Sequence, residues 1–225
     1  MINIDLGSNL LNYIIQQGFK PGDKLPSIQD LASDSHLDMS VSKIREQLEV
    51  ARALGLVEVR SKRGTLLTDY TFTPAVRLSA LYALACGESF EQFASLRNHM
   101  EAAYWNEACA LLTEDDLVAM QKCITTANEK LNSPQIHIPN QEHRIFHLTV
   151  FKHLDNPFVI GILEAYWELY EEVGVNRYMD YTYLKQVWDY HTRILSLIRE
   201  RRFDDAQQAF VEHTRLLRYE PRRES

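Results

Sequence analysis

The sequence lacks any run of about 18 uncharged apolar residues, the length that a membrane-spanning helix requires. Its first residues also lack the basic segment and the small-residue cleavage site of a secretory signal peptide. We therefore expect a cytoplasmic protein that does not enter a membrane. Cysteine is scarce, and the wide spacing of Cys86, Cys109 and Cys123 fits neither a disulfide framework nor a Cys-x-x-Cys metal site. We expect all three to be reduced thiols in the core.

An excess of positive charge is also missing, because the formal net charge at pH 7 is −7. Residues 1–73 hold nearly equal numbers of basic and acidic side chains, so most of the acidity lies in the rest of the chain. Phosphate binding needs positive charge, and the overall charge alone does not predict a nucleic-acid partner. Two small basic groups in the first part, at 43–45 and 60–63, still permit a basic face.

Apolar residues are plentiful, at 45% of the sequence, and charged residues make up 24%, as in ordinary globular proteins. A length of 225 residues exceeds one average domain and favours two domains, each with its own core.

The first part of the chain has the pattern of a winged helix-turn-helix. Apolar residues recur at helical spacing over 6–17, Ser27 can cap a short second helix, and a third helix is predicted over 41–54. Two β-prone runs, 56–59 and 65–67, flank a Ser-Lys-Arg-Gly turn and predict a hairpin. Helix, helix-turn-helix and hairpin follow one another in the order of a winged helix.

The second part of the chain has helical periodicity and no strand pattern. Short loops between the helices favour an antiparallel bundle. We expect a mainly α protein, with a winged helix-turn-helix domain over 1–70, a linker over 71–76 and an antiparallel all-α bundle of six to seven helices over 77–225. The predicted helices are 75–86, 89–112, 114–132, 140–154, 157–177, 181–201 and 204–218.

Four segments in order resemble the amino-terminal domain of the GntR family of bacterial regulators. These segments are PGDKLPS, the Leu31-Ala32 pair, the stretch from Ser40 to Leu48, and GLVEVRSKRGT. The resemblance implies a DNA-binding domain whose recognition helix enters the major groove while its wing contacts the backbone or minor groove. This sequence departs from the family at Gln29 and Val41, where arginine is frequent, which implies a weaker or differently read operator.

By this resemblance, the DNA-facing residues lie at the start of the recognition helix and at the wing: Ser40, Ser42, Lys43, Arg45, Arg63 and Gly64. Arg45 is the strongest candidate. The alternative for Arg45 is a surface ion pair with Glu49, four residues further along the same helix. The alternative for the basic wing residues is a solvated loop without a partner.

Histidines form the second notable pattern. His143 and His147 are four residues apart, which places both imidazoles on one face of a helix. His191 and His213 lie on the last two predicted helices, equally far in sequence from the turn expected near residue 202. In an antiparallel pair of helices they therefore reach the same height, so that four imidazoles can converge in the bundle.

The histidine pattern resembles the FCD effector domain of the FadR-like GntR subfamily, in particular its metal-containing members. That resemblance implies His147, His191 and His213 as metal ligands, together with His143 where the family has aspartate. Four neutral imidazoles favour Zn or Ni over Mg, Ca or Mn. The Arg-x-x-x-Glu formed by Arg97 and Glu101 is also similar to the family. Arg97 can bind an effector carboxylate, or it can form an ordinary ion pair within its helix.

The family further implies a homodimer on a pseudo-palindromic operator, with a small carboxylate such as a sugar acid, hydroxy acid or dicarboxylate as effector. One alternative is a metal-dependent enzyme in the helical part, with the winged helix as a docking module. The zinc-protease motif His-Glu-x-x-His is absent, because Arg144 follows His143. Another alternative is a constitutive DNA-binding protein whose histidines are structural.

Overall fold

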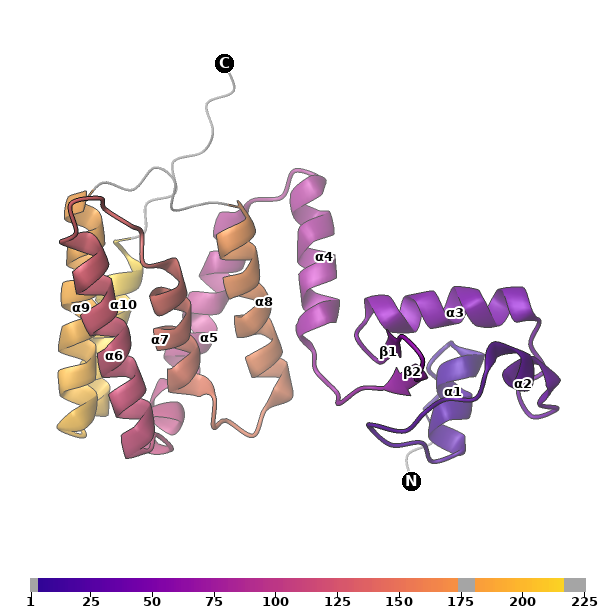
Figure 1. Ribbon diagram of the computed structural model, residues 1–225. Helices are drawn as coiled ribbons and strands as arrows, with labels where there is room; N and C mark the ends of the chain where they lie inside the picture. Colours follow the sequence, from indigo (N-terminus) through magenta and orange to yellow (C-terminus); the bar gives the residue numbers. More distant parts are fainter. Residues whose placement is uncertain (1–3, 174–180, 217–225) are drawn as a thin grey trace, which may run out of the picture. The chain divides into compact units, whose positions relative to one another are not determined.

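The computed structural model describes residues 4–173 and 181–216 and divides the chain into two compact units, residues 1–79 and 80–225 (Figure 1). The predicted fold class is confirmed. The described residues are mostly helical, with a single small antiparallel sheet in the first unit. Within these ranges, none of the helices has both the length and the apolar character needed to cross a membrane.

The first unit contains three helices followed by a hairpin: α1 (Asn9–Gln16), α2 (Ile28–Ser33), α3 (Val41–Ala53), β1 (Val57–Arg60) and β2 (Gly64–Leu67). Its core is built from one apolar face of each helix and the inner face of the first strand, including Leu10, Leu31, Ile44 and Val57. This is the winged helix-turn-helix that the sequence predicts.

Side-chain caps define where the helices of the first unit begin. Ser27 forms a capping box with Asp30 at the start of α2, and the Ser40 side chain accepts a hydrogen bond from the Lys43 amide at the start of α3. Such caps satisfy amide groups that have no partner inside the helix. They fix the turn between α2 and α3 and therefore the beginning of the recognition helix.

The wing is a hairpin in which Val57 pairs with Leu67 and Arg60 pairs with Gly64. Its loop, residues 61–63, includes Lys62 at a φ of 65°, and Gly64 follows at a φ of 87°, both in the left-handed region. A glycine tolerates this conformation without a steric penalty. The turn is therefore tight, and it presents basic side chains at its tip.

Helix α4 (Thr73–Ala85) begins two residues before its predicted start at residue 75, inside the predicted linker. The physical reason is the position of Pro74 in the first turn, where a missing N–H costs no helical hydrogen bond. The division between the two compact units falls within this helix, after Ser79. The domain bounds 1–70 and 77–225 stay a prediction.

The second unit is a bundle of long helices that pack side by side (Figure 1): α5 (Phe90–Ala110), α6 (Glu114–Leu131), α7 (Asn140–Phe151), α8 (Pro157–Val173), α9 (Tyr181–Arg199) and α10 (Phe203–Thr214). Thr113 and Asp116 form a capping box at the start of α6, and the Asn156 side chain accepts hydrogen bonds from amides in the first turn of α8. The predicted ends of α8 and α10, at 174–177 and 217–218, lie outside the described residues.

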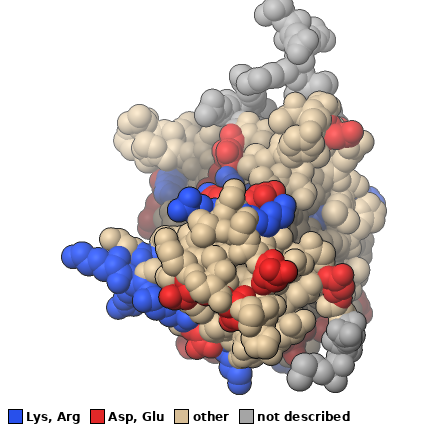
Figure 2. All heavy atoms as spheres, turned by 90° about the vertical axis from the view of Figure 1, so that its right-hand side faces the viewer, with Lys and Arg blue, Asp and Glu red and all other residues tan. Residues whose placement is uncertain are grey.

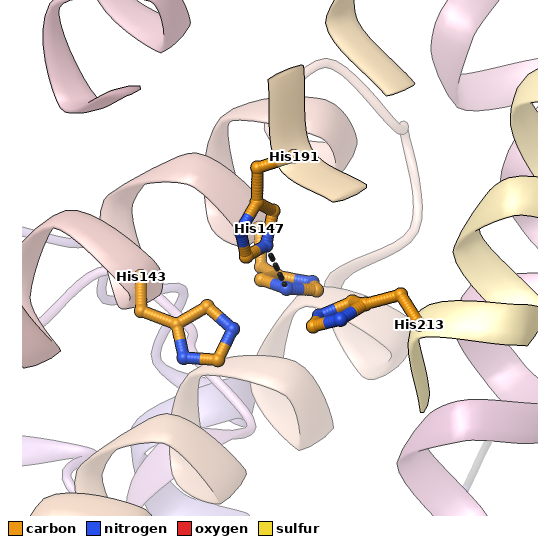
Figure 3. A group of neighbouring side chains, drawn as sticks. All are labelled: His143, His147, His191 and His213. Carbon is orange, nitrogen blue, oxygen red and sulfur yellow. Dashed lines mark hydrogen bonds between the residues drawn. The ribbon is translucent and has the colours of Figure 1, made fainter. Parts of the chain in front are cut away.

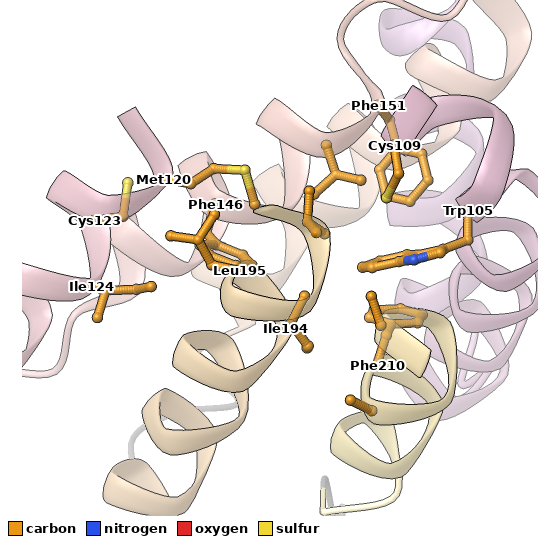
Figure 4. Close-up of a cluster of buried hydrophobic side chains, with 14 of the residues drawn as sticks. Trp105, Cys109, Met120, Cys123, Ile124, Phe146, Phe151, Ile194, Leu195 and Phe210 are labelled. Atoms are coloured by element: carbon orange, nitrogen blue, oxygen red, sulfur yellow. The ribbon is translucent and has the colours of Figure 1, made fainter. Parts of the chain in front are cut away.

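The core of the bundle is aromatic at its centre (Figure 4). Trp105 from α5 stacks on Phe210 from α10, with ring centroids 4.6 Å apart, and contacts Phe151 from α7 edge-on at 6.1 Å. Cys109 and Cys123 are buried free thiols in this core, as predicted, whereas Cys86 is exposed and that prediction was wrong. Cys86 directly follows the last residue of α4 and precedes Gly87, which has a positive φ, so it lies in the turn after the helix.

Candidate metal centre and nucleic-acid interface

The start of α3 presents the polar side chains that the sequence assigns to DNA. Ser42, Lys43 and Arg45 are exposed, and the exposed Ser40 caps the helix with its hydroxyl oxygen, 3.3 Å from the Lys43 amide nitrogen. Lys43 also forms an exposed ion pair with Glu46 at 3.2 Å. Exposed pairs of this kind are weak, so that a phosphate can compete for the lysine.

The ion pair considered as the alternative for Arg45 does not form. Glu49 instead pairs with Arg52, whose Nη2 lies 2.8 Å from the Glu49 carboxylate. Within residues 4–173 and 181–216, Arg45 has no ion pair or side-chain hydrogen bond. The guanidinium therefore projects from the recognition helix into solvent.

At the wing, Arg63 and Gly64 are exposed, as are Lys62 and Arg60 beside them. Arg60 is partly neutralised by Glu58, at 2.6 Å on the same strand. In the space-filling view, the largest group of Lys and Arg side chains lies at one edge of the face, and smaller groups lie beside Asp and Glu side chains elsewhere on it (Figure 2). Positive charge on this face therefore lies next to negative charge, in agreement with the balanced composition of residues 1–73.

The bundle brings all four predicted histidines together (Figure 3). His143 and His147 project from α7, His191 from α9 and His213 from α10, and all four are buried. One ring nitrogen from each histidine lies within 4.8 Å of the corresponding nitrogens of the other three. Spacing along α7 and the level positions on α9 and α10 produce this arrangement.

The distance between His147 and His191 suits a small cation. Zn–N bonds of about 2.0–2.1 Å in a tetrahedron separate the ligand nitrogens by roughly 3.3 Å. The Nε2 atoms of His147 and His191 are 3.2 Å apart. His143 Nε2 and His213 Nδ1 are buried and have no hydrogen-bond partner among the described residues. Buried polar atoms normally have a partner, so the donor set and its unsatisfied nitrogens fit a divalent transition metal.

The surroundings keep the four imidazoles neutral. Burial lowers the pKa of His143, His147 and His191 well below the ordinary value, and the nearby Arg97 charge lowers it further. Burial, with a smaller effect of Arg97, also lowers the pKa of His213 to about 3. Neutral imidazole is the form that binds metal ions.

Arg97 lies beside the histidine cluster and is itself fully buried. Its Nε is 2.9 Å from the Glu101 carboxylate, and its Nη2 is 2.8 Å from His147 Nδ1. The guanidinium also lies over the rings of Tyr166 and Trp167, at 4.9 and 4.8 Å from their centroids. The ion pair within the helix is therefore present, and it lies beside the histidine cluster. Effector binding by Arg97 stays a prediction.

Glu101 is not among the predicted site residues, although with Arg97 it forms the Arg-x-x-x-Glu pattern. Its side chain is completely buried, and one carboxylate oxygen lies 3.4 Å from His147 Nδ1. Burial raises the pKa of Glu101 to about 7, against the opposing effect of Arg97. An Arg-x-x-x-Glu pattern occurs on many exposed helices, and only the burial of this face distinguishes the pair.

Two cavities lie next to aromatic side chains around the histidine cluster. The one that touches His143 has a volume of about 10 Å³, which is close to the space of one water molecule. A larger cavity of about 420 Å³ lies between α5, α8 and α10, and Tyr166 and Tyr170 form part of its lining. The candidate metal site is thus enclosed. An organic molecule that binds there must be small or must displace neighbouring side chains.

Both parts of the chain match known protein families. Residues 5–67 match the bacterial regulatory proteins of the gntR family, and residues 92–216, more than half of the chain, match the FCD domain. The chain belongs to the GntR family and carries an FCD domain. GntR-family regulators bind DNA operators and are typically dimeric.

Known relatives agree with this family. The HTH-type transcriptional regulator LutR of Bacillus subtilis is 26% identical over 204 residues, which cover 86% of this chain and 89% of LutR. The Uxu operon transcriptional regulator of Escherichia coli is 22% identical, over 93% of this chain and 82% of that protein. A Streptococcus agalactiae GntR structure has a similar fold, with a TM-score of 0.61, 19% identity and coverage of 92% and 94% of the two chains.

The family and these relatives are transcription regulators, and the interpretation as an enzyme is not supported. The protein is therefore a transcription regulator with an FCD effector-binding domain.

The neutral histidines predict how the stability of the metal-free protein depends on pH. Histidines in the unfolded chain bind protons near pH 6.5, but the folded cluster does not. The contribution of these neutral histidines to the free energy of unfolding is therefore complete above about pH 6.5. It decreases as pH falls, by up to about 1.4 kcal/mol per pH unit for each such histidine. For His213 the decrease continues down to a pKa of about 3. Urea unfolding of chelator-treated protein at several pH values measures this slope.

A pair of variants isolates the contribution of the cluster. His213→Gln removes one buried imidazole, so that unfolding takes up about one proton fewer. The slope of the unfolding free energy against pH should fall by about 1.4 kcal/mol per pH unit. His137→Gln replaces an exposed histidine and should leave the slope unchanged. Equal slopes in the wild type and in His213→Gln would contradict the prediction.

Proposed function

We propose that this regulator binds a divalent transition metal at His143, His147, His191 and His213, and that a small carboxylate bound there modulates its affinity for operator DNA. The observation that carries the proposal is the convergence of four buried, neutral imidazoles in the FCD domain. In this proposal the protein works in the cytoplasm as a homodimer, since a two-fold dimer matches the two half-sites of a pseudo-palindromic operator.

The donor set suggests the metal. Four nitrogen ligands favour Zn or Ni over the oxygen-preferring Mg, Ca and Mn. Because neutral imidazoles leave the full charge of the cation uncompensated, an anionic ligand is attracted to the centre. Arg97 is the nearest cationic side chain in the surroundings of His147 and is the second group that we assign to an effector carboxylate.

The DNA-binding half of the proposal assigns base or phosphate contacts to Ser40, Ser42, Lys43 and Arg45 on α3 and to Arg63 and Gly64 at the wing. Exposure of these residues supports the assignment, as does the lack of an ion-pair partner for Arg45 among the residues that the structure describes. A recognition helix places its amino-terminal residues against base edges, which is where these side chains lie.

Replacing Arg45 tests the DNA contact. Arg45→Ala should weaken operator binding by about 1–3 kcal/mol if the guanidinium contacts a base edge, and by less if it contacts only phosphate. Fluorescence anisotropy at fixed salt, with DNA from upstream of the protein's own gene, measures the effect. Arg52→Ala is the matched control, because Arg52 lies on the same helix but pairs with Glu49. Equal affinities of wild type, Arg45→Ala and Arg63→Ala would overturn the docking mode.

Metal analysis tests the histidine centre. The purified protein should contain about one Zn or Ni per chain, and the double variant His191→Ala, His213→Ala should contain almost none. Plasma mass spectrometry gives the metal content, and chelation should lower the thermal stability of the wild type because metal binding stabilises the folded state. Full stability after chelation, with no gain on adding metal, would favour purely structural histidines.

Coupling between the two domains tests the regulatory part. Sugar acids, hydroxy acids and dicarboxylates are first screened by thermal shift against the metal-loaded protein. An acid that binds at the metal should change operator affinity about 5- to 150-fold, and operator DNA should change the affinity for the acid by the same factor. Acids that stabilise the wild type and the double histidine variant equally do not bind at the metal. Binding at the metal without a change in operator affinity would contradict regulation by that acid.

A further inference from the structure

The hydrogen bond between Arg97 and His147 determines which nitrogen of the imidazole carries the proton. Arg97 Nη2 lies 2.8 Å from His147 Nδ1. A guanidinium has N–H donors and no acceptor, so His147 Nδ1 must offer its lone pair. The neutral ring therefore carries its proton on Nε2, which lies 3.2 Å from His191 Nε2.

This arrangement is incompatible with a metal on His147. A metal ion needs the lone pair of a ring nitrogen. If Nδ1 is the ligand, the ion takes the position of the Arg97 donor. If Nε2 is the ligand, the ring proton moves to Nδ1, where two N–H groups would then face each other. In both cases the hydrogen bond from Arg97 must break.

Charge acts in the same direction as hydrogen bonding. Arg97 and His147 are both buried, and repulsion between a guanidinium and a divalent cation is stronger in such surroundings than in water. Arg97 also keeps partners that do not depend on His147, since its Nη1 donates to Asn98 Oδ1 at 2.9 Å. The side chain can therefore leave His147 without losing all of its hydrogen bonds.

Glu101 supplies the acceptor that Arg97 cannot. Its Oε2 lies 3.4 Å from His147 Nδ1 and 2.9 Å from Arg97 Nε. Histidines that bind metals commonly donate their other N–H to a carboxylate, which orients the ring. When Nδ1 carries the proton, Glu101 Oε2 is the carboxylate oxygen beside it that can accept the hydrogen bond.

We infer that Arg97 competes with the metal for His147, and that Glu101 is the positioning residue that orients His147 toward the metal. This inference rests on the proposed metal binding by the four histidines. It assigns opposite effects to two side chains that form one ion pair, which a merely structural pair would not have.

Zinc affinities of single variants test the inference. Arg97→Met removes the competing donor and its charge and should tighten zinc binding about tenfold or more. Glu101→Gln removes the anionic acceptor and should weaken zinc binding about 10- to 100-fold. Arg193→Met is the matched control, because Arg193 pairs with Glu212 on the exposed surface of the same bundle, and it should leave the affinity unchanged. Competition with a chromogenic chelator gives the dissociation constants.

The outcomes separate this inference from the proposed function. Zinc binding that depends on His191 but is unchanged or weaker in Arg97→Met would overturn the inference alone. A wild type that binds no zinc would overturn the proposed function and the inference with it.

A measurement on the wild type guards against misfolding of the variants. In metal-free protein labelled with ¹⁵N-histidine, the imidazole signals that disappear in His147→Gln should show a protonated Nε2 and an unprotonated Nδ1 that accepts a hydrogen bond. A proton on Nδ1 in the metal-free protein would mean that Arg97 does not occupy this atom, which would overturn the inference. Zinc addition should replace the pattern by one in which a ring nitrogen of His147 binds the ion.

Discussion

A guanidinium group in the middle of a helical bundle must be compensated, because the loss of hydration of an isolated buried charge costs several kcal/mol. Arg97 is compensated by three kinds of contact: the carboxylate of Glu101, the faces of two aromatic rings, and the lone pair of His147. These partners come from α5, α7 and α8. The packing of three helices is thus tied to the placement of one cation.

The same cation influences the chemistry of the histidine cluster. A positive charge next to buried imidazoles adds to the effect of burial and opposes their protonation. The rings therefore stay in the neutral form that can bind a metal ion. Arg97 favours the ligand form of the cluster by its charge and occupies one ligand, His147, by its hydrogen bond. In our proposals, Arg97 competes with the metal for His147 and donates hydrogen bonds to the effector carboxylate.

The DNA-binding unit follows a simpler principle. Its small apolar core holds α3 and the wing, and the side chains assigned to DNA remain exposed. Glu49 is engaged by Arg52, which leaves the Arg45 guanidinium in solvent. Local ion pairing on one helix therefore decides which arginine is available. A chain with net negative charge can still present a basic edge to DNA, because electrostatic interactions at physiological salt extend only about 8–10 Å.

The sequence by itself determined what depends on local spacing and on the chemistry of neighbouring residues. The caps at Ser27 and Thr113 and the alignment of His143 with His147 are properties of short segments, and they agree with the structure. The level of His191 and His213 followed from the symmetry of an antiparallel pair of helices. The equal height of these two histidines in the bundle was therefore predictable from the sequence.

Only the tertiary structure decided which side chains meet between helices. An Arg97–Glu101 pair has the same local spacing on an exposed helix as in a core, and the packing of α5 against α7 buried it beside His147. Cysteine is usually a core residue, yet Cys86 is exposed, because it lies in the turn after α4. Contacts between helices depend on how whole faces pack, and spacing along one helix carries no information about that packing.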